Sequence, residues 1–259
     1  MLLVGLGFFF NYQNNTIEVS EFQVTSNRVG TLKIVQLSDL HGKQYGTLNE
    51  NLQKQVEGLA PDLIVVSGDM VDDSGRNIEE TIAFLDVLGQ ETPLVCVLGN
   101  HEWRLRERPE IWEALQERNI RVLENEILSL DVNGSEVHIL GIDERLRKTT
   151  GVDVSPFFAE LAQMPSLRIV LSHHPERYAL AKDDSYNQYD FDLMFAGHAH
   201  GGQWDLPLIG GVVAPGQGLF PHYYRGMYDD RLIVSTGLGN GTLAPRLFNY
   251  PQIVVVKVN

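Results

Sequence analysis

Short runs of apolar, β-branched residues alternate along the chain with longer segments in which apolar positions recur at helical spacing. The short runs predict eight main strands, at residues 32–37, 62–66, 94–98, 136–141, 167–171, 192–195, 232–235 and 253–258. The longer segments predict four helices, at residues 48–59, 78–88, 109–118 and 175–181. The first three strands are thus separated by helices, an order typical of an α/β layer fold.

The pattern becomes richer in strands after residue 121. Residues 127–130 and 137–140 flank Asn133-Gly134, a dipeptide that favours a type I′ turn in a β-hairpin. These elements exceed what one doubly wound sheet needs, so we expect two packed sheets with helices outside them. Since no repeat or low-complexity stretch interrupts the chain, we also expect one domain over residues 26–259 behind an N-terminal segment of residues 1–25.

The N-terminal segment opens with ten apolar residues, MLLVGLGFFF. A helix that crosses a bilayer needs roughly 20, so this run cannot span a membrane alone. The first basic side chain is Arg28 and no small-residue cleavage site follows the run, which excludes an ordinary secretory signal. Two interpretations remain open, a mobile or surface-packed end and the remnant of a membrane anchor. The first is compatible with a cytoplasmic protein and the second with a membrane-associated one.

Composition and charge narrow the class of protein. The 259 residues are 43% hydrophobic, enough for one substantial core, which excludes a disordered or disulfide-scaffold chain. The net charge is −14 and the pI is near 4.9, so the surface repels phosphate backbones and nucleic acid is not an expected partner. The one cysteine, Cys96, lies in an apolar run, and no disulfide can form within the chain.

Polar side chains follow five of the predicted strands at the point where each strand ends. The five segments are Ser38-Asp39-Leu40-His41-Gly42, Ser67-Gly68-Asp69, Gly99-Asn100-His101-Glu102, Ser172-His173-His174-Pro175 and Gly197-His198-Ala199-His200-Gly201-Gly202. Because strands of an α/β sheet share one carboxyl edge, we expect these segments to converge there. Two carboxylates, a carboxamide and several imidazoles without a thiolate suit a pair of divalent ions such as Mn, Fe, Zn or Co.

The spacing of these residues supports a shared site. In Asp39-x-His41 and His198-x-His200, residues two apart on an extended segment point the same way and can approach a common centre. Taken alone, Asp69 after a strand is an ordinary turn former. All five segments together are hard to explain as turns, because two histidines in a glycine-rich turn gain little without a ligand.

The five motifs together resemble those of the calcineurin-like metallophosphoesterases. The resemblance covers the chain from Lys33 to the C-terminus. The surrounding residues are similar to a bacterial membrane-associated phosphodiesterase subgroup, which includes enzymes of the UDP-2,3-diacylglucosamine pyrophosphatase type. Members of that subgroup commonly begin with a membrane helix, which favours the anchor interpretation of the N-terminal segment.

The resemblance implies a four-layer α/β/β/α sandwich of two mixed sheets, the metallo-dependent phosphatase fold, and a centre of two divalent ions (Mn, Fe or Zn). The implied ligands are Asp39, His41 and His200 for one ion, Asn100, His173 and His198 for the other, and Asp69 as the bridge. His101 would be the catalytic histidine, and Glu102 would shape its loop. The implied reaction is in-line attack of a metal-bridging hydroxide on a phosphodiester or pyrophosphate bond of a small molecule, lipid-linked or a nucleotide sugar.

Two competing classes of function fit the sequence less well. A non-catalytic scaffold that binds a partner would typically have lost a ligand or the free histidine, and here each one is present. A metallo-β-lactamase-like hydrolase would need a His-x-His-x-Asp-His run, which the sequence does not contain.

Two secondary features keep alternatives open. Residues 202–230 are rich in glycine, proline and aromatics. Three roles are open for this segment: a wall of the site, a surface that faces a lipid-like substrate, or a surface loop packed by its own aromatics. Two basic clusters have two interpretations, binding of a second phosphate or simple solvation. The first cluster is Arg104, Arg106 and Arg108, and the second is Arg145, Arg147 and Lys148.

Overall fold

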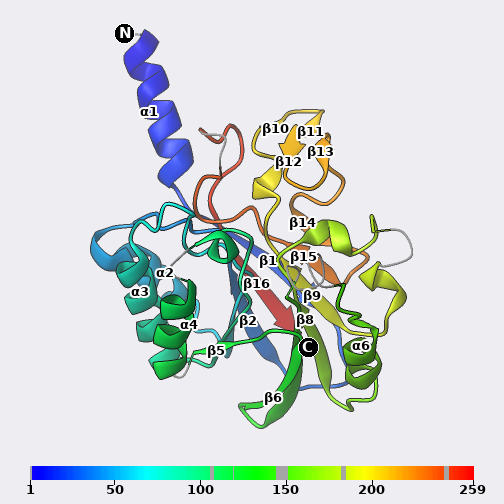
Figure 1. The fold of residues 1–259 in the computed structure, drawn as a ribbon. Coiled ribbons are helices and arrows are strands. Elements are labelled where there is room, and N and C mark those ends of the chain that lie inside the picture. Colours follow the sequence, from blue (N-terminus) through cyan, green and yellow to red (C-terminus); the bar gives the residue numbers. More distant parts are fainter. Residues whose placement is uncertain (1, 106–107, 119, 144–150, 182–184, 242–244) are drawn as a thin grey trace.

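Two six-stranded mixed sheets pack face to face in the part of the chain that the computed structural model describes. Helices cover the outer face of each sheet, which gives the four layers expected from the sequence (Figure 1). The described residues are 2–105, 108–118, 120–143, 151–181, 185–241 and 245–259.

The first sheet has the strand order β1-β16-β2-β3-β4-β5. Its strands are β1 (Glu18–Val24), β2 (Leu32–Leu37), β3 (Leu63–Val66), β4 (Leu94–Cys96), β5 (Arg121–Val122) and β16 (Gln252–Val258). Strands β2 to β5 are parallel neighbours, so the residues after β2, β3 and β4 leave the sheet at one edge. Strand β1, inside the expected N-terminal segment, pairs in parallel with β16.

The second sheet has the order β14-β15-β9-β8-β7-β6. Its strands are β6 (Glu126–Val132), β7 (Ser135–Gly141), β8 (Leu167–Leu171), β9 (Leu193–Ala196), β14 (Gly226–Tyr228) and β15 (Leu232–Val234). Strands β7, β8, β9 and β15 run parallel, so β8 and β9 also end at a common edge. Asn133 and Gly134 both have positive φ, 53° and 80°, as the predicted type I′ hairpin between β6 and β7 requires.

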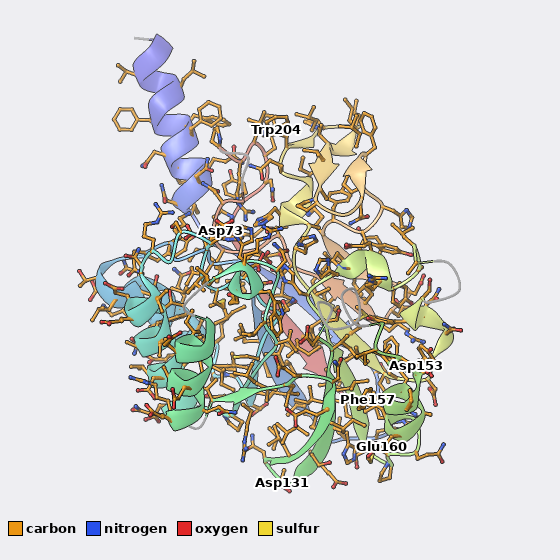
Figure 2. All side chains as sticks on the ribbon, in the orientation of Figure 1. Asp73, Asp131, Asp153, Phe157, Glu160 and Trp204 are labelled. Carbon is orange, nitrogen blue, oxygen red and sulfur yellow. The ribbon has the colours of Figure 1, made fainter. Side chains whose placement is uncertain are left out.

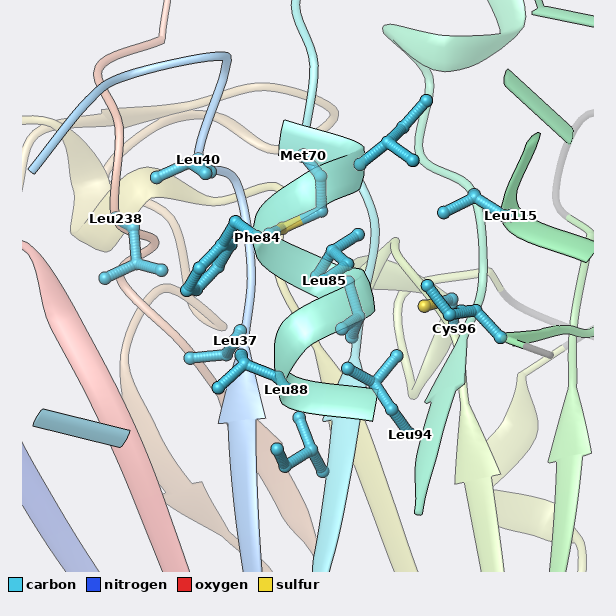
Figure 3. Packing of buried hydrophobic residues seen from close by; sticks show 14 of the residues in the cluster. Leu37, Leu40, Met70, Phe84, Leu85, Leu88, Leu94, Cys96, Leu115 and Leu238 are labelled. Carbon is cyan, nitrogen blue, oxygen red and sulfur yellow. The ribbon is translucent and has the colours of Figure 1, made fainter. Parts of the chain in front are cut away.

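Helices α2 (Glu50–Gly58), α3 (Ile78–Glu91) and α4 (Arg108–Glu117) cover the outer face of the first sheet. Figure 3 shows Phe84, Leu85 and Leu88 of α3 packed over side chains of the underlying strands. Positions three and four residues apart share one helix face, so the spacing of these residues explains why α3 forms and which face it buries. Helix α6 (Ser155–Leu161) covers the second sheet.

Both faces of the central strands are buried. In β2, Ile34 belongs to the apolar cluster between the sheets, whereas Val35 belongs to the cluster beneath the helices. The same alternation holds in β3 for Leu63 and Ile64. Burial on both sides explains why these strands are continuous apolar runs in the sequence.

The remaining elements are short. Four small strands form two hairpins near one end of the molecule, β10 (Asp205–Leu206) with β11 (Gly210–Gly211) and β12 (Val213–Ala214) with β13 (Gly218–Leu219). Single 3-10 turns are η1 (Thr47–Asn49), η2 (Glu102–Arg104), η3 (Pro175–Arg177), η5 (Tyr186–Gln188) and η6 (His200–Gly202).

The apolar N-terminal run forms α1 (Leu2–Asn15), which extends away from the body of the molecule (Figure 1). Asn14, in its last turn, hydrogen-bonds both backbone groups of Arg246: the side-chain oxygen accepts from the N–H at 2.8 Å, and the amide donates to the carbonyl at 3.3 Å. Among the described helices, none combines the length and apolar character needed to cross a membrane.

One predicted helix is wrong, and several elements were not predicted, among them β1, α1, α6 and the short strands β5 and β10 to β14. Residues 175–181 form only the 3-10 turn η3, because the segment is too short and interrupted to sustain a helix after Pro175. Strand β1 escaped prediction because its exposed, polar residues alternate at a sheet edge. Helix α1 was not predicted because its apolar part has no polar face. Helix α6 was not predicted because it is only seven residues long.

We expect Phe84→Ala to lower the free energy of unfolding by about 3 to 5 kcal/mol, because Phe84 is 2% exposed and its removal leaves a cavity in the core beneath α3. Val87→Ala, on the exposed side of the same helix, should change it by less than about 0.5 kcal/mol. Urea unfolding followed by circular dichroism measures both. Equal effects of the two substitutions would contradict this account of the core.

Candidate metal centre

The five predicted segments converge where the carboxyl edges of the two sheets meet. The segments after β2, β3 and β4 come from the first sheet, and those after β8 and β9 come from the second. In the described part of the chain, four groups of three side chains have ligand atoms within 4.8 Å of one another, and two of these groups consist entirely of predicted ligands. The first group is Asp39, His41 and His200, and the second is Asp69, His173 and His198.

The first group presents one carboxylate and two imidazoles to a common point. His200 Nε2 lies 3.5 Å from Asp39 Oδ1 and 3.2 Å from His41 Nε2. Burial lowers the pKa of both His41 and His200, so each ring is neutral at pH 7. A neutral imidazole is the form that binds a metal.

The second group is oriented by a backbone carbonyl. His173 Nδ1 donates to the Ser67 carbonyl at 2.7 Å, because a carbonyl oxygen can only accept. This leaves Nε2 directed at Asp69 Oδ2, 3.1 Å away, and at His198 Nδ1, also 3.1 Å away. Metal-binding histidines typically donate their other ring N–H to a carbonyl or a carboxylate in this way.

Charge also favours a cation in the second group. Burial acts to lower the pKa of His173, but the Asp69 carboxylate outweighs it and raises the pKa to about 10. The imidazole therefore holds a proton between Nε2 and Asp69 at neutral pH, and a divalent cation that binds between these atoms displaces that proton. Burial lowers the pKa of His198, which leaves that ring neutral.

Asp69, a member of the second group, also faces the first. Its Oδ2 is 3.1 Å from His173 Nε2 and 4.0 Å from His41 Nε2. Asn100 is the remaining predicted ligand, and its buried Oδ1 has no hydrogen-bond partner in the part of the chain that the structure describes. Asn100 lines a cavity of about 260 Å³ together with Asp69 and His198. An orphaned amide oxygen at this position fits a metal ligand, since buried acceptors are otherwise satisfied.

The donor set therefore fits two divalent ions. The seven predicted ligand residues supply carboxylate oxygen, amide oxygen and imidazole nitrogen, a mixture suited to borderline divalent cations.

The backbone at the site differs from the sequence-based expectation. The predicted pairs were expected on extended segments, but the residues have left-handed φ angles. The values are 51° for Asp39, 52° for His41, 53° for Asp69, 65° for His198 and 47° for His200. Non-glycine residues rarely adopt this conformation, and where they do it is often at functional sites. The turned backbone, and not a period-two alternation, aims these side chains inward.

One glycine permits the two sheets to meet. A Cβ on Gly197 would lie 2.0 Å from Ser38 Oγ and 2.3 Å from Asp39 Oδ2. The next residue, His198, donates its backbone N–H to the Asp39 carboxylate at 3.1 Å. The absence of a side chain at residue 197 therefore lets the second sheet approach the ligand on the first.

Glu102 supports the loops from beneath. Its buried carboxylate accepts three backbone N–H groups, from Asp69 at 2.9 Å, Val71 at 3.0 Å and Gly99 at 2.8 Å. Burial, with Asp69 adding to it, raises the pKa of Glu102 to about 7. The sequence predicted that Glu102 shapes the His101 loop, and these bonds extend its role to the Asp69 loop.

His101 lies at the rim of the cavity with 14% of its side chain exposed. Its backbone N–H donates to Asp69 Oδ1 at 2.7 Å, and its ring packs edge-on against His41. The ring nitrogens are 4.0 Å from Asp69 Oδ2 and 3.6 Å from Oδ1 of Asp73, a residue labelled in Figure 2. His101 therefore borders the two groups while its imidazole remains accessible from the cavity.

A larger hollow adjoins the cavity. It has a volume of about 720 Å³ and is lined by Trp103, Arg104 and Arg177 among others. Of the predicted basic clusters, Arg104 lies here. The others fall outside the described residues or, for one, outside the described side chains; they are Arg106, Arg108, Arg145, Arg147 and Lys148.

The segment of residues 202–230 has two of its expected roles. Val213, Ala214 and Pro215 wall the cavity. Tyr223 and Tyr228 belong to the apolar cluster over the second sheet, so part of the segment is packed by its own aromatics.

Sequence reasoning missed Arg246. This side chain is completely buried and donates to the carbonyl oxygens of Gly237 and Gly239 in the loop after β15. Arg246 is the one charged residue between positions 232 and 256 of the sequence. A single charge in a long uncharged stretch could have marked it as a residue with a structural role.

The sequence matches the model of a known protein family. The model of the calcineurin-like phosphoesterase family matches residues 32–202, which is more than half of the chain and contains all five segments.

Similar chains occur in bacteria. YkoQ of Bacillus subtilis, an uncharacterized metallophosphoesterase, is 26% identical, and the match covers 99% of this chain and 97% of the relative. YkuE of the same organism, also an uncharacterized metallophosphoesterase, is 28% identical over 97% of this chain and 88% of the relative. Phosphodiesterase YaeI of Escherichia coli is 27% identical over 87% of this chain and 82% of the relative.

We expect Glu102→Gln to weaken Mn²⁺ binding by about 10- to 100-fold, because a Gln side chain has one acceptor oxygen and its NH₂ group would face a backbone N–H. Glu79→Gln, at an exposed position of α3, is the matched control and should bind Mn²⁺ like the wild type. Calorimetric titration measures both affinities. Unchanged affinity in Glu102→Gln would show that this carboxylate does not position the loops.

Proposed function

The chain belongs to the calcineurin-like phosphoesterase family, and on that premise we propose that it hydrolyses a phosphodiester or pyrophosphate bond of a small molecule with the help of two divalent metal ions. The observation that carries the proposal is that the Asp69 carboxylate, which belongs to the second group of buried ligand atoms, also faces His41 of the first group. A carboxylate that faces both sets of ligands could be shared by two ions, and two-metal sites are found in phosphatases and nucleases.

The proposed ligands are those expected from the sequence. Asp39, His41 and His200 hold one ion, and their ligand atoms lie within 4.8 Å of one another. Asn100, His173 and His198 hold the other, with Asp69 shared. Mn, Fe and Zn all suit this mixture of oxygen and nitrogen donors.

When bound, two such ions supply a nucleophilic water of lowered pKa and neutralise charge on the phosphoryl group. The chain's own residues orient the reaction. Ser67 and Glu102 hold the His173 ring and the Asp69 loop in place. His101, accessible at the rim, is placed to donate a proton to the leaving oxygen, a role worth roughly 10² to 10⁴ in rate.

Two observations support a diester over a monoester. The hollow of about 720 Å³ beside the cavity offers room for a substituent on each side of the phosphorus. One similar protein, YaeI, is a phosphodiesterase by name. Arg104, which lines both cavity and hollow, can contact a second phosphate, as a pyrophosphate, nucleotide-sugar or lipid-linked substrate would require.

We expect the protein to cleave bis-p-nitrophenyl phosphate faster than p-nitrophenyl phosphate in Mn²⁺. Chelation with EDTA should reduce the rate to that of buffer, and excess Mn²⁺ should restore it, because the donor set requires divalent ions. Release of p-nitrophenol measures both reactions. Failure of protein with two bound metals to cleave either ester would favour the non-catalytic scaffold.

We expect His101→Ala to lower the turnover of bis-p-nitrophenyl phosphate by about 10² to 10⁴ while two metal ions remain bound, because His101 is proposed as a proton donor and not as a ligand. His222→Ala, an exposed histidine that does not line the cavity, is the control. Turnover and elemental analysis are measured on the same samples. Loss of metal in His101→Ala would instead make this residue a ligand.

A further inference from the structure

Another cluster of ligand-type side chains lies beside the metal centre. His174, Glu176 and His198 have ligand atoms within 4.8 Å of one another, the same relation that holds for the two groups of predicted ligands. We call these three residues the third group. His198 also belongs to the second group, whereas His174 and Glu176 have no part in the proposed two-metal centre.

The turn after β8 brings the third group together. Strand β8 ends at Leu171, and the 3-10 turn η3 (Pro175–Arg177) begins four residues later. Within this segment His174 Nδ1 donates to Glu176 Oε1 at 3.0 Å, because an ionised carboxylate can only accept. The His174 ring packs on the His198 ring, with centroids 4.1 Å apart. The turn therefore places a carboxylate and an imidazole next to a histidine of the second group.

The Glu176 carboxylate is charged and incompletely bonded. Burial acts to raise its pKa, but the hydrogen bond and charge of His174 outweigh burial and hold the pKa below its ordinary value, so Glu176 is ionised at neutral pH. Its second oxygen, Oε2, is buried and has no hydrogen-bond partner among the described residues. A buried anionic oxygen is unfavourable unless a donor or a cation lies next to it. The charge therefore favours a cation at this point.

The loop between β12 and β13 restrains this carboxylate. A Cβ on Gly216 would lie 2.2 Å from Glu176 Oε1. Gly216 has a φ of 73°, in the left-handed region that favours glycine. The backbone at residue 216 thus closes against the carboxylate and limits its movement away from His174.

The third group faces the larger hollow. His174, Glu176 and His198 all line this hollow of about 720 Å³. The side chains of His174 and Glu176 are 22% and 16% exposed, so a cation bound to them keeps coordination positions open for water or a ligand. Among the described residues that line the hollow, Glu176 carries the one carboxylate, whereas Arg104 and Arg177 are basic. The attraction of a cation to this wall therefore depends on Glu176.

His198 can contact two ions because an imidazole has two ring nitrogens. Its Nδ1 lies 3.1 Å from His173 Nε2, so Nδ1 faces the second ion of the proposed centre. Nε2 is the nitrogen left for the third group, and a cation there takes the place of any proton on it. Because the second ion repels another cation nearby, we expect binding at the third group to be the weaker of the two.

We propose that His174, Glu176 and His198 bind a third divalent cation at the wall of the hollow. Two imidazoles and one carboxylate with a position left open are a ligand set of catalytic zinc sites, so Zn²⁺ is the appropriate probe. The inference rests on the proposed function, because the third ion is counted in addition to the two ions of that centre.

Calorimetric titration of the metal-free full chain with Zn²⁺ tests the proposal. Wild-type protein should bind three ions, the third roughly tenfold or more weakly than the first two. Glu176→Gln and His174→Phe should each abolish binding of the third ion and keep the first two, because each removes a ligand atom and His174→Phe retains the ring that packs on His198. Glu160→Gln on α6 (Figure 2) and His222→Phe are the matched controls, at exposed positions that do not line the cavity or the hollow, and should bind three ions.

The number of bound ions separates the outcomes. Wild-type protein that binds only two ions has no third site, which overturns this proposal and leaves the proposed function standing. Fewer than two ions in the wild type contradicts the proposed function as well. Three ions in either Glu176→Gln or His174→Phe would assign the third ion to other residues, and loss of a second ion from either variant would make these residues supports of the second group. Both of these results overturn the proposal, and retention of the first two ions shows that a variant is folded.

Discussion

The two buried carboxylates at the junction of the sheets, Asp39 and Asp69, constrain the rest of the structure. Their side chains are 0% and 1% exposed, and burial of an anion is costly unless donors or cations surround it. Most of these donors come from elsewhere in the chain: His198 donates to Asp39 and His101 donates to Asp69, while the neighbouring Ser38 hydroxyl also donates to Asp39. The carboxylates thus hold the loops together, and their remaining charge creates the demand for a cation.

The register of the strands sets where these donors lie. The Gln36 side chain, buried in β2, donates to Ser67 Oγ on its own sheet and to the Ala196 carbonyl on the other, both at 2.8 Å. Because side chains alternate along a strand, a shift of one residue would turn Gln36 toward the helices and remove both bonds. The geometry of the candidate centre therefore depends on the register of strand β2 against its neighbours, as well as on the ligand loops.

The parts of the fold that local pattern determines were predictable from sequence. Buried strands and the face of α3 follow from apolar spacing, and the five ligand segments were recognisable because each follows such a strand. The features that the sequence did not predict depend on contacts between residues that are far apart in the chain. The left-handed backbone of Asp39 is held by distant loops, since its N–H donates to the Gly68 carbonyl and its carbonyl accepts from Gly239. Glu102 gains its role from N–H groups about thirty residues earlier. The exposed edge strand β1 is likewise defined by its pairing with β16.

Arg246 connects helix α1 with the ligand loops. Burial lowers the pKa of its guanidinium to about 10, so the side chain stays charged at pH 7. It donates to the Gly239 carbonyl at 3.0 Å, and the Gly239 N–H donates in turn to the Asp39 carbonyl at 2.6 Å. Its own backbone pairs with Asn14 of α1. Helix α1 is therefore joined to the loop that carries Asp39 through three consecutive buried contacts, and breaking any one of them would cost free energy.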